Sequence, residues 1–172
     1  MFRDHRRPGR LILICGLPGA GKTTFARHLE RELGAVRVCP DEWKYALGVD
    51  FYDEGFRVRL EKRLSALSQE LLSLGQTVIL EFGFWARIER DEKREAARAM
   101  GAAVELHFLD LPFDELWRRV ERRNSAGEPG TVPISRANLE HWATLFQAPD
   151  AAELRLYDRP LVSAWQAPGL NR

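Results

Sequence analysis

The segment from Gly16 to Thr23 constrains this chain more than any other part of its sequence. It reads Gly-Leu-Pro-Gly-Ala-Gly-Lys-Thr and fits the pattern G-x-x-x-x-G-K-S/T. A wholly apolar run precedes it at residues 11–15, and a helical stretch follows at residues 22–33, with Gly34 as its expected end. A buried strand, a glycine-rich turn and a helix in this order are the structural context that the motif requires.

The residue types in this segment are those of a phosphate-binding loop. Glycines allow backbone conformations that a side chain would block, so successive N–H groups can converge on phosphate beside the positive end of a helix dipole. Lys22 is expected to reach the β- and γ-phosphates of ATP or another NTP, and Thr23 is expected to bind Mg2+. The predicted nucleotide-binding residues are Gly16, Pro18, Gly19, Ala20, Gly21, Lys22, Thr23 and Thr24.

Short apolar runs alternate with longer helical patterns along the rest of the chain. This alternation predicts one α/β domain of the P-loop NTPase fold, with a parallel five-stranded sheet and helices on both faces. Such sheets bind ligands beyond the carboxyl ends of their strands. The strands are expected at residues 11–15, 36–39, 77–82, 104–109 and 153–157, and the helices at 22–33, 41–48, 56–74, 88–100, 113–123 and 135–146.

Two further segments are expected to lack regular structure. Residues 1–9 are interpreted as a disordered tail of the single domain 1–172. Residues 124–133 are rich in Gly, Pro and Ser and are interpreted as a mobile lid loop.

Composition argues against several other classes of protein. The 172 residues are 45% hydrophobic and 30% charged, as in an ordinary globular domain. The net charge of +1 provides no long-range field for nucleic acid, which is therefore not an expected partner. The sequence has neither a secretory h-region nor a membrane-spanning run, and its two cysteines, Cys15 and Cys39, are interpreted as reduced core thiols. We therefore expect a cytoplasmic monomer or homodimer.

Carboxylates follow two of the predicted strands. Asp41 comes directly after the second strand, where a doubly wound kinase faces its phosphoryl acceptor, and it can orient an acceptor hydroxyl and take its proton. The alternative role is a helix N-cap, which is compatible with the first, and Glu42 is the next candidate base. Glu81 ends the third strand and is expected to hold Mg2+ together with Thr23, the alternative being a solvated strand end.

Other side chains are expected to form the acceptor pocket. Arg87 follows a turn at residues 83–86 and is predicted to point toward the acceptor or the transferring phosphate. Arg90 and Arg94, further along the same helix, are interpreted as a solvated face. Trp43 and Tyr52 lie in a stretch that mixes carboxylates with aromatic rings, which suits a polyhydroxylated or cationic small molecule, although an ordinary amphipathic cover is the alternative.

Four arginines crowd the helix that precedes the lid loop. Their charges repel unless an anion or carboxylates lie between them, which favours a lid that closes over the γ-phosphate. The alternative is a solvated basic face paired with Glu115 and Glu121. The arginines are Arg118, Arg119, Arg122 and Arg123, and of these Arg119 and Arg123 are the predicted phosphate ligands.

Taken together, these residues resemble the small P-loop kinases of the AAA_33-like group, which includes chloramphenicol phosphotransferase, the zeta toxins and polynucleotide-kinase-type kinase domains. The resemblance covers residues 11–157 and rests on GLPGAGKTT at 16–24, Asp41, Glu81 and DLPFDELWRRVERRN at 110–124. It implies that Asp41 is the general base and that the last run binds phosphate. The predicted catalytic residues are Lys22, Asp41, Arg119 and Arg123. Residues 83–87 are also similar to the acceptor-site GFPR of adenylate kinases, with Trp in place of Pro and one extra residue.

The favoured function is Mg2+-dependent transfer of the γ-phosphate of ATP to a hydroxyl of a small molecule, such as an antibiotic, a natural product or a nucleotide sugar. A nucleoside or nucleotide kinase would need arginines that clamp an acceptor phosphate. A regulatory ATP-binding module would need no base, so Asp41 argues against it. A nucleic-acid kinase would need a basic surface, which the net charge does not indicate.

Overall fold

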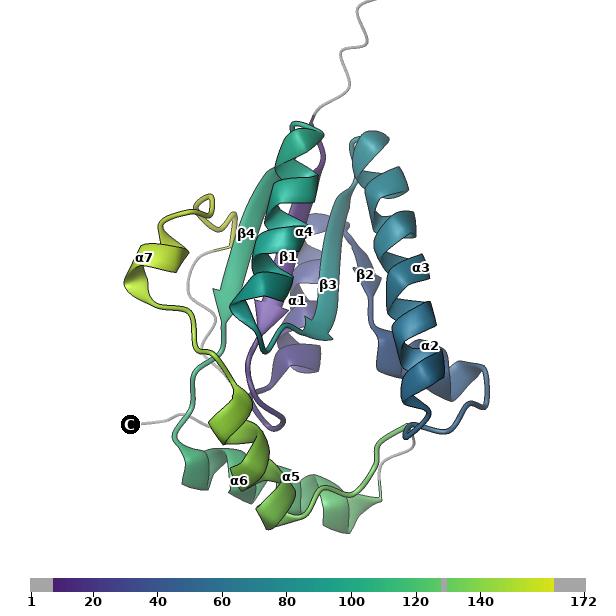
Figure 1. The fold of residues 1–172 in the computed structure, drawn as a ribbon, viewed down its shortest axis with the longest axis vertical. Coiled ribbons are helices and arrows are strands. Elements are labelled where there is room, and N and C mark those ends of the chain that lie inside the picture. Colours follow the sequence, from purple (N-terminus) through teal and green to yellow (C-terminus); the bar gives the residue numbers. More distant parts are fainter. Residues whose placement is uncertain (1–7, 128–129, 163–172) are drawn as a thin grey trace, which may run out of the picture.

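A parallel four-stranded sheet forms the centre of the structure, a computed structural model in which residues 8–127 and 130–162 are described (Figure 1). The strands lie in the order β2-β3-β1-β4, and every neighbouring pair is parallel. Their carboxyl ends therefore meet at one edge, which we call the carboxyl edge. The strands are β1 (Arg10–Cys15), β2 (Val36–Val38), β3 (Thr77–Gly83) and β4 (Ala103–Phe108).

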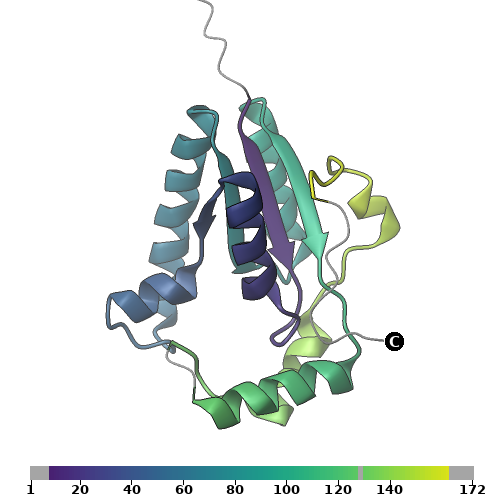
Figure 2. The same cartoon turned by 180° about the vertical axis from the view of Figure 1, so that it is seen from behind.

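Helices cover both faces of the sheet, as predicted. Helix α1 lies on one face, and α3 and α4 lie on the other (Figures 1 and 2). The helices are α1 (Lys22–Leu33), α2 (Pro40–Ala46), α3 (Glu54–Ser73), α4 (Arg87–Ala99), α5 (Phe113–Ala126), α6 (Arg136–Leu145) and α7 (Ala151–Leu154).

The wholly apolar sequence of β1 is explained by burial on both sides. Ile12 packs in a cluster with Phe25 of α1, whereas Leu13 packs in a separate cluster with Leu64 of α3. A central parallel strand has no face left for water, so alternation of polar and apolar residues is absent. The thiols of Cys15 and Cys39 are buried and free, and burial raises the pKa of each to about 12.

Helices α5 and α6 lie beyond the carboxyl edge of the sheet (Figure 1). Leu116 and Val120 of α5 form a third buried cluster with Ala20 of the glycine-rich loop and Leu139 of α6. This cluster fixes α5 against the loop at residues 16–23, which we call the P-loop. The arginines of α5 are thereby carried to the edge where the strands end.

The predicted fifth strand at residues 153–157 is wrong. Asp150 caps the short helix α7 by accepting a hydrogen bond from the N–H of Glu153, and a turn follows the helix. The alternating sequence would have buried Leu154 and Leu156, but both are exposed and Glu153 is buried. The segment is held by an ion pair between Glu153 and buried Arg90, which a strand with its leucines inward would break.

Most other predicted boundaries agree closely with the structure. Helix α5 continues to Ala126 and ends at Gly127, which is in the left-handed conformation, so the first residues of the predicted lid 124–133 are helical. Residues 128 and 129 of that lid, and residues 1–7 of the predicted tail, lie outside the described part. Gly9 is buried against Leu72, so it belongs to the folded domain. Among the described residues, no helix is both long enough and apolar enough to cross a membrane.

Replacement of Leu64 by alanine is expected to lower the free energy of unfolding by about 2–5 kcal/mol, because it removes buried methyl groups and leaves a cavity. Leu64 is 1% exposed, whereas Val58 on the same helix is 66% exposed and supplies the control. Val58→Ala is expected to change the stability by about 0.5 kcal/mol or less. Urea denaturation measures both, and equal losses would mean that this face of α3 does not pack on the sheet.

Candidate active site

The P-loop runs from β1 to α1 and passes close to the segment between β4 and α5. Gly16, Gly19 and Gly21 have φ angles of 147°, 86° and 91°, a region that side chains rarely adopt. A Cβ atom on Gly16 would lie 2.7 Å from the carbonyl oxygen of Leu109, and one on Gly19 would lie 2.7 Å from that of Leu116. Glycine is therefore required at these positions both for conformation and for space.

The first turn of α1 is open to an anion. Its N-cap is Gly21, which has no side chain with which to bond the first N–H groups of the helix. Thr23 and Thr24, in that first turn, are exposed. Free N–H groups and the positive end of the helix dipole together form a phosphate site, so the geometry fits the predicted role of this loop.

Lys22 folds back over the P-loop. Its Nζ atom donates hydrogen bonds to the carbonyl oxygens of Gly16 and Leu17, at 2.9 and 3.0 Å. These carbonyls hold the ammonium group in place until a stronger acceptor, such as a phosphate oxygen, is present.

Three other predicted site residues act electrostatically on the ammonium group of Lys22. Burial lowers the pKa of Lys22, the negative charges of Glu81 and Asp41 raise it, and the positive charge of Arg123 lowers it further. The folded chain therefore places residues of β3, α2 and α5 within electrostatic range of Lys22 in α1.

Thr23 and Glu81, the two predicted metal ligands, are in direct contact. The Thr23 hydroxyl donates a hydrogen bond to Oε1 of Glu81, and Oε2 of Glu81 accepts one from Nη1 of Arg37 at 2.9 Å. The pairing of β3 with β1 shifts register between Leu80 and Gly83, next to Glu81. A hydroxyl beside a carboxylate is a donor set that suits Mg2+, so these residues fit the predicted metal.

Arg37 is a site residue that sequence reasoning missed. Its largely buried guanidinium bridges Glu81 and Glu42, with 2.5 Å between Nη2 and Oε2 of Glu42, and Arg27 binds the other oxygen of Glu42 at 2.9 Å. Burial alone would raise the pKa of Glu42, but the hydrogen bonds and charges of both arginines lower it. Glu42 is therefore held as a carboxylate with both oxygens engaged. The available signal was a single arginine between two valines in β2, just before Asp41.

Asp41 lies in the first turn of α2, with its carboxylate exposed. The N-cap of this helix is Cys39 and Pro40 occupies the first turn, so the alternative prediction that Asp41 is the N-cap is wrong. Oδ1 of Asp41 lies 3.3 Å from Nη1 of Arg57, a residue of α3 that the sequence did not single out. Arg57 also pairs with Glu61 at 2.8 Å, which places a short row of charges beside Asp41.

A buried lysine fixes the position of α2. The Nζ atom of Lys44 donates hydrogen bonds to the carbonyl oxygens of Phe51 and Asp53, at 2.8 and 3.3 Å, and the side chain is wholly buried. Asp53 in turn caps α3 by accepting a hydrogen bond from the N–H of Phe56. The connection from α2 to α3 is thus held internally, and with it the relative position of Asp41 and Arg57.

The arginines of α5 divide into inward and outward residues. Nη1 of Arg119 would lie 3.7 Å from a Cβ atom on Gly21, so this guanidinium reaches the P-loop, and the charge of Arg123 acts on Lys22. Arg118 is exposed and pairs with Glu115, which also binds Nε of Arg119 at 2.5 Å. Arg119 therefore pairs with Glu115 and also lies near the P-loop, whereas Arg118 only pairs with Glu115.

The predicted acceptor residues are more dispersed. Trp43 and Tyr52 are exposed, on α2 and on the connection to α3. Arg87 begins α4, is exposed, and pairs with Asp91 one turn along, with 3.4 Å between Nε and Oδ2. A Cβ atom on Gly130 would lie 3.2 Å from the ring of Tyr45, so the loop after α5 reaches α2.

The predicted solvated face of α4 is wrong. Arg90 is wholly buried, and Arg94 is largely buried in contact with Asp91 and the ring of Tyr157. The predicted spacing was correct, but these arginines face the segment that forms α7. Glu153, which pairs with Arg90, and Tyr157, whose ring Arg94 contacts, each lie 63 residues away along the chain, so a local pattern did not reveal them.

Comparison with known proteins supports the predicted resemblance. The model of the AAA_33 family, described as an AAA domain, matches residues 11–149. The chain is 31% identical to the shikimate kinase of Aeromonas salmonicida (strain A449) over 121 residues, which are 66% of this chain and 65% of that kinase. The match thus spans just under two thirds of the length of that relative.

Two solved structures show the same fold. Kti12 of Chaetomium thermophilum, in complex with ADP-AlF3, matches with a TM-score of 0.66 and 20% identity over 83% of this chain and 82% of that chain. A chain of the Pnkp1/Rnl/Hen1 RNA repair complex matches with a TM-score of 0.70 and 24% identity over 98% of this chain and 52% of that chain. The predicted α/β P-loop fold is confirmed, with four strands in the described sheet.

Replacement of Arg37 by glutamine is expected to destabilise the protein by about 3–5 kcal/mol, because it leaves the buried carboxylate of Glu81 without its cation. Arg27→Gln is the matched control, since Arg27 binds Glu42 at an exposed position and should contribute about 1 kcal/mol or less. Chemical denaturation at neutral pH compares the two variants. A loss for Arg37→Gln no greater than that for Arg27→Gln would contradict the bridging role.

Proposed function

The chain belongs to the AAA_33 family, and on that premise we propose that it is an ATP-dependent kinase that phosphorylates a hydroxyl of a small molecule. The observation that carries the proposal is the exposed carboxylate of Asp41 within electrostatic reach of Lys22. A nucleotide switch needs the P-loop but no such carboxylate beside it. The similarity to a shikimate kinase supports the same class of reaction.

In this proposal ATP occupies the P-loop. Lys22 exchanges its hydrogen bonds to the carbonyls of Gly16 and Leu17 for bonds to phosphate oxygens. Arg119 and Arg123 approach the phosphates from α5, and the segment after α5 serves as the lid. Fixed positive charges that already surround the site stabilise the charge that develops during transfer, without reorganisation at that moment.

Thr23 and Glu81 are proposed to hold Mg2+, directly or through water. When bound, the metal neutralises charge on the β- and γ-phosphate oxygens. Arg37 keeps Glu81 in a single orientation through its second oxygen, so the oxygen that contacts Thr23 remains directed at the P-loop.

Asp41 is proposed as the general base. The acceptor oxygen forms a bond to the γ-phosphorus while the bond to the β–γ bridging oxygen breaks, and the hydroxyl proton passes to the carboxylate of Asp41. Arg57 binds one oxygen of that carboxylate and so restricts its orientation. Glu42 is a poorer candidate because Arg37 and Arg27 occupy both of its oxygens.

Electrostatics favour an acceptor that is not an anion. Arg57 binds both Asp41 and Glu61, at 3.3 and 2.8 Å. Burial and the charges of Glu89 and Asp41 raise the pKa of Glu61 although Arg57 lowers it, so negative charge exceeds positive charge around this arginine. We therefore propose a neutral or cationic polyhydroxylated acceptor, such as an antibiotic or a natural product; a nucleotide-sugar type compound fits less well because its diphosphate is anionic. Trp43 and Tyr52 are the proposed contacts for its rings.

Two other classes of acceptor molecule are the alternatives. A hydroxylated carboxylic acid is suggested by the shikimate kinase relative, and a nucleoside or nucleotide by the predicted role of Arg87. The pairing of Arg87 with Asp91 weakens the second, because that guanidinium is already engaged by a carboxylate. A panel of neutral, cationic and acidic alcohols, assayed for ATP consumption with the purified protein, distinguishes the three.

Lys22→Ala is expected to abolish phosphoryl transfer while the fold is retained, because the ammonium group contacts loop carbonyls rather than the apolar core. Circular dichroism reports the fold, and an ATP turnover assay reports the activity. Turnover within a few-fold of the wild-type value would remove Lys22 from the catalytic site.

Asp41→Asn is expected to leave the affinity for ATP nearly unchanged and to lower kcat by about 10²–10⁴-fold, because the amide cannot take the proton. Glu42→Gln is the matched neighbour and should reduce kcat far less. Calorimetry measures ATP binding, and acceptor-dependent turnover measures kcat. The reverse order of the two losses would make Glu42 the base, and a large loss of ATP affinity in Asp41→Asn would place Asp41 in the nucleotide site.

A further inference from the structure

The turn that leaves β3 is strained and held from several sides. Phe84 has a φ of 49°, and among the described residues it is the only one other than glycine with a positive φ. Such a conformation costs about 1–2 kcal/mol in a residue with a side chain and persists only where its surroundings impose it. The turn, residues 83–86, follows Glu81 at the carboxyl edge and leads into α4.

Arg90 holds the carbonyl oxygen of Phe84 in this turn. Its Nη1 atom donates a hydrogen bond to the carbonyl oxygen of Phe84 at 3.0 Å, while Nε and Nη2 bind both oxygens of Glu153 at 2.6 and 2.8 Å. Both side chains are almost completely buried. Burial of two charges costs free energy unless their geometry is favourable. Here the planar guanidinium of Arg90 donates two hydrogen bonds to the carboxylate of Glu153, which offsets that cost.

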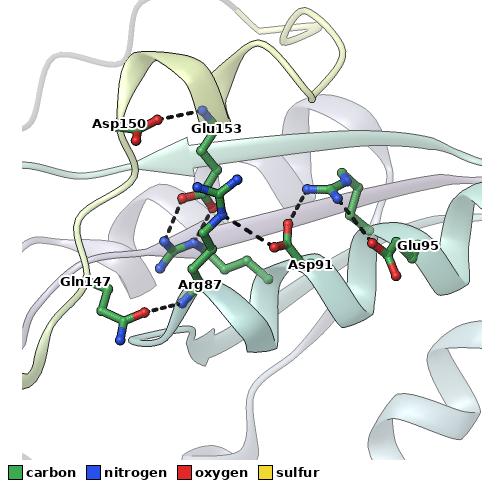
Figure 3. A network of polar contacts seen from close by, with 8 residues as sticks. Arg87, Asp91, Glu95, Gln147, Asp150 and Glu153 are labelled. Atoms are coloured by element: carbon green, nitrogen blue, oxygen red, sulfur yellow. Dashed lines mark hydrogen bonds and ion pairs between the residues drawn. The ribbon is translucent and has the colours of Figure 1, made fainter.

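Gln147 holds the rest of the turn from the connection between α6 and α7. Its side-chain Oε1 accepts a hydrogen bond from the backbone N–H of Arg87 at 2.9 Å (Figure 3). Its backbone N–H donates to the carbonyl oxygen of Trp85, also at 2.9 Å. The ring of Trp85 also contacts that of Trp142, with 5.6 Å between centroids. The partners of the turn thus come from a segment about 60 residues later.

The turn borders the acceptor side of the site. The N–H of Ala86 donates to Oε2 of Glu89, 3.0 Å away. Val38 of β2 pairs with Leu80 of β3, so Asp41 and the start of the turn each lie three residues beyond this pair, at the carboxyl edge. The turn and the proposed base therefore leave neighbouring strands at the same edge, while the P-loop is held in addition by its own glycines and by α5.

We propose that Gln147, Arg90 and Glu153 are positioning residues for the acceptor: they hold the 83–86 turn in the conformation that places the acceptor hydroxyl before Asp41. This inference rests on the proposed kinase function. The hydrogen bonds of these residues run to the turn, to Arg87, to one another and to Asp150 rather than to the P-loop, so their removal is expected to affect the acceptor and to leave the nucleotide site intact. The turn is held at the carbonyl oxygens of Phe84 and Trp85 and at the N–H of Ala86, and the N–H of Arg87 directly after it is held as well.

Gln147→Ala is the decisive variant, because Gln147 is exposed and its loss removes only the bond to the N–H of Arg87. We expect the acceptor KM to rise about five- to tenfold, as for the loss of one hydrogen bond, with the ATP affinity unchanged. Gln147→Glu keeps an oxygen acceptor and should restore the wild-type KM. Glu140→Ala, at an exposed site on α6 that pairs with Arg136, is the matched control.

Amide hydrogen exchange of the free protein gives a readout that needs no activity. Gln147→Ala and Arg90→Lys should speed exchange at residues 84–87 and leave residues 16–24 unchanged, whereas Glu140→Ala should alter neither. Calorimetry with a non-hydrolysable ATP analogue completes the comparison. If Arg90→Lys fails to fold, the Gln147 variants still decide the matter.

The outcomes separate this inference from the proposed function. Faster exchange in the turn with a raised acceptor KM and unchanged ATP affinity supports the positioning role. Unchanged exchange, or an ATP affinity that falls as much as the acceptor affinity, overturns it while the kinase function stands. Absence of acceptor-dependent turnover in the wild-type protein overturns the proposed function and, with it, the acceptor role of the turn.

Discussion

The close approach of the P-loop to the segment between β4 and α5 is the constraint on which the rest of the structure depends. Gly16 and Gly19 lie so near the carbonyl oxygens of Leu109 and Leu116 that no side chain fits between them. This contact brings α5 against the loop, and Arg119 with it. A loop built of larger residues would stand away from α5, and the positive charges around the phosphate site would disperse.

Buried cations hold the loops that carry the site. Lys44 binds the connection from α2 to α3, Arg37 joins β2 to Glu81 and Glu42, and Arg90 joins the turn after β3 to α7. Each cation loses its bound water on burial, and directed hydrogen bonds to carbonyls or carboxylates replace that water. Apolar side chains could fill the same volume, but they would not fix the orientation of a carboxylate or a backbone carbonyl.

This arrangement divides the site into two parts with separate supports. The nucleotide side rests on local backbone geometry, since glycines and the start of α1 create the anion site within one short segment. The proposed acceptor side depends on ion pairs between helices, such as Asp41 with Arg57, and on the turn held by Gln147 and Arg90. Members of a family that share the first part can therefore differ in acceptor through changes in the second.

The sequence by itself determined the P-loop, its flanking strand and helix, and the candidate roles of Lys22, Thr23 and Asp41, because each is encoded within a few consecutive residues. Periodicity also located α1 to α6 and the four described strands, but it misread residues 153–157, whose leucines alternate as in a strand while Glu153 is the residue that turns inward. Only the tertiary structure decided the partners of Arg37, Arg57 and Arg90. From sequence alone, a charged side chain is predicted to be solvated unless its counter-ion is known. The counter-ions of these arginines come from other elements of the fold, which packing rather than sequence spacing brings close.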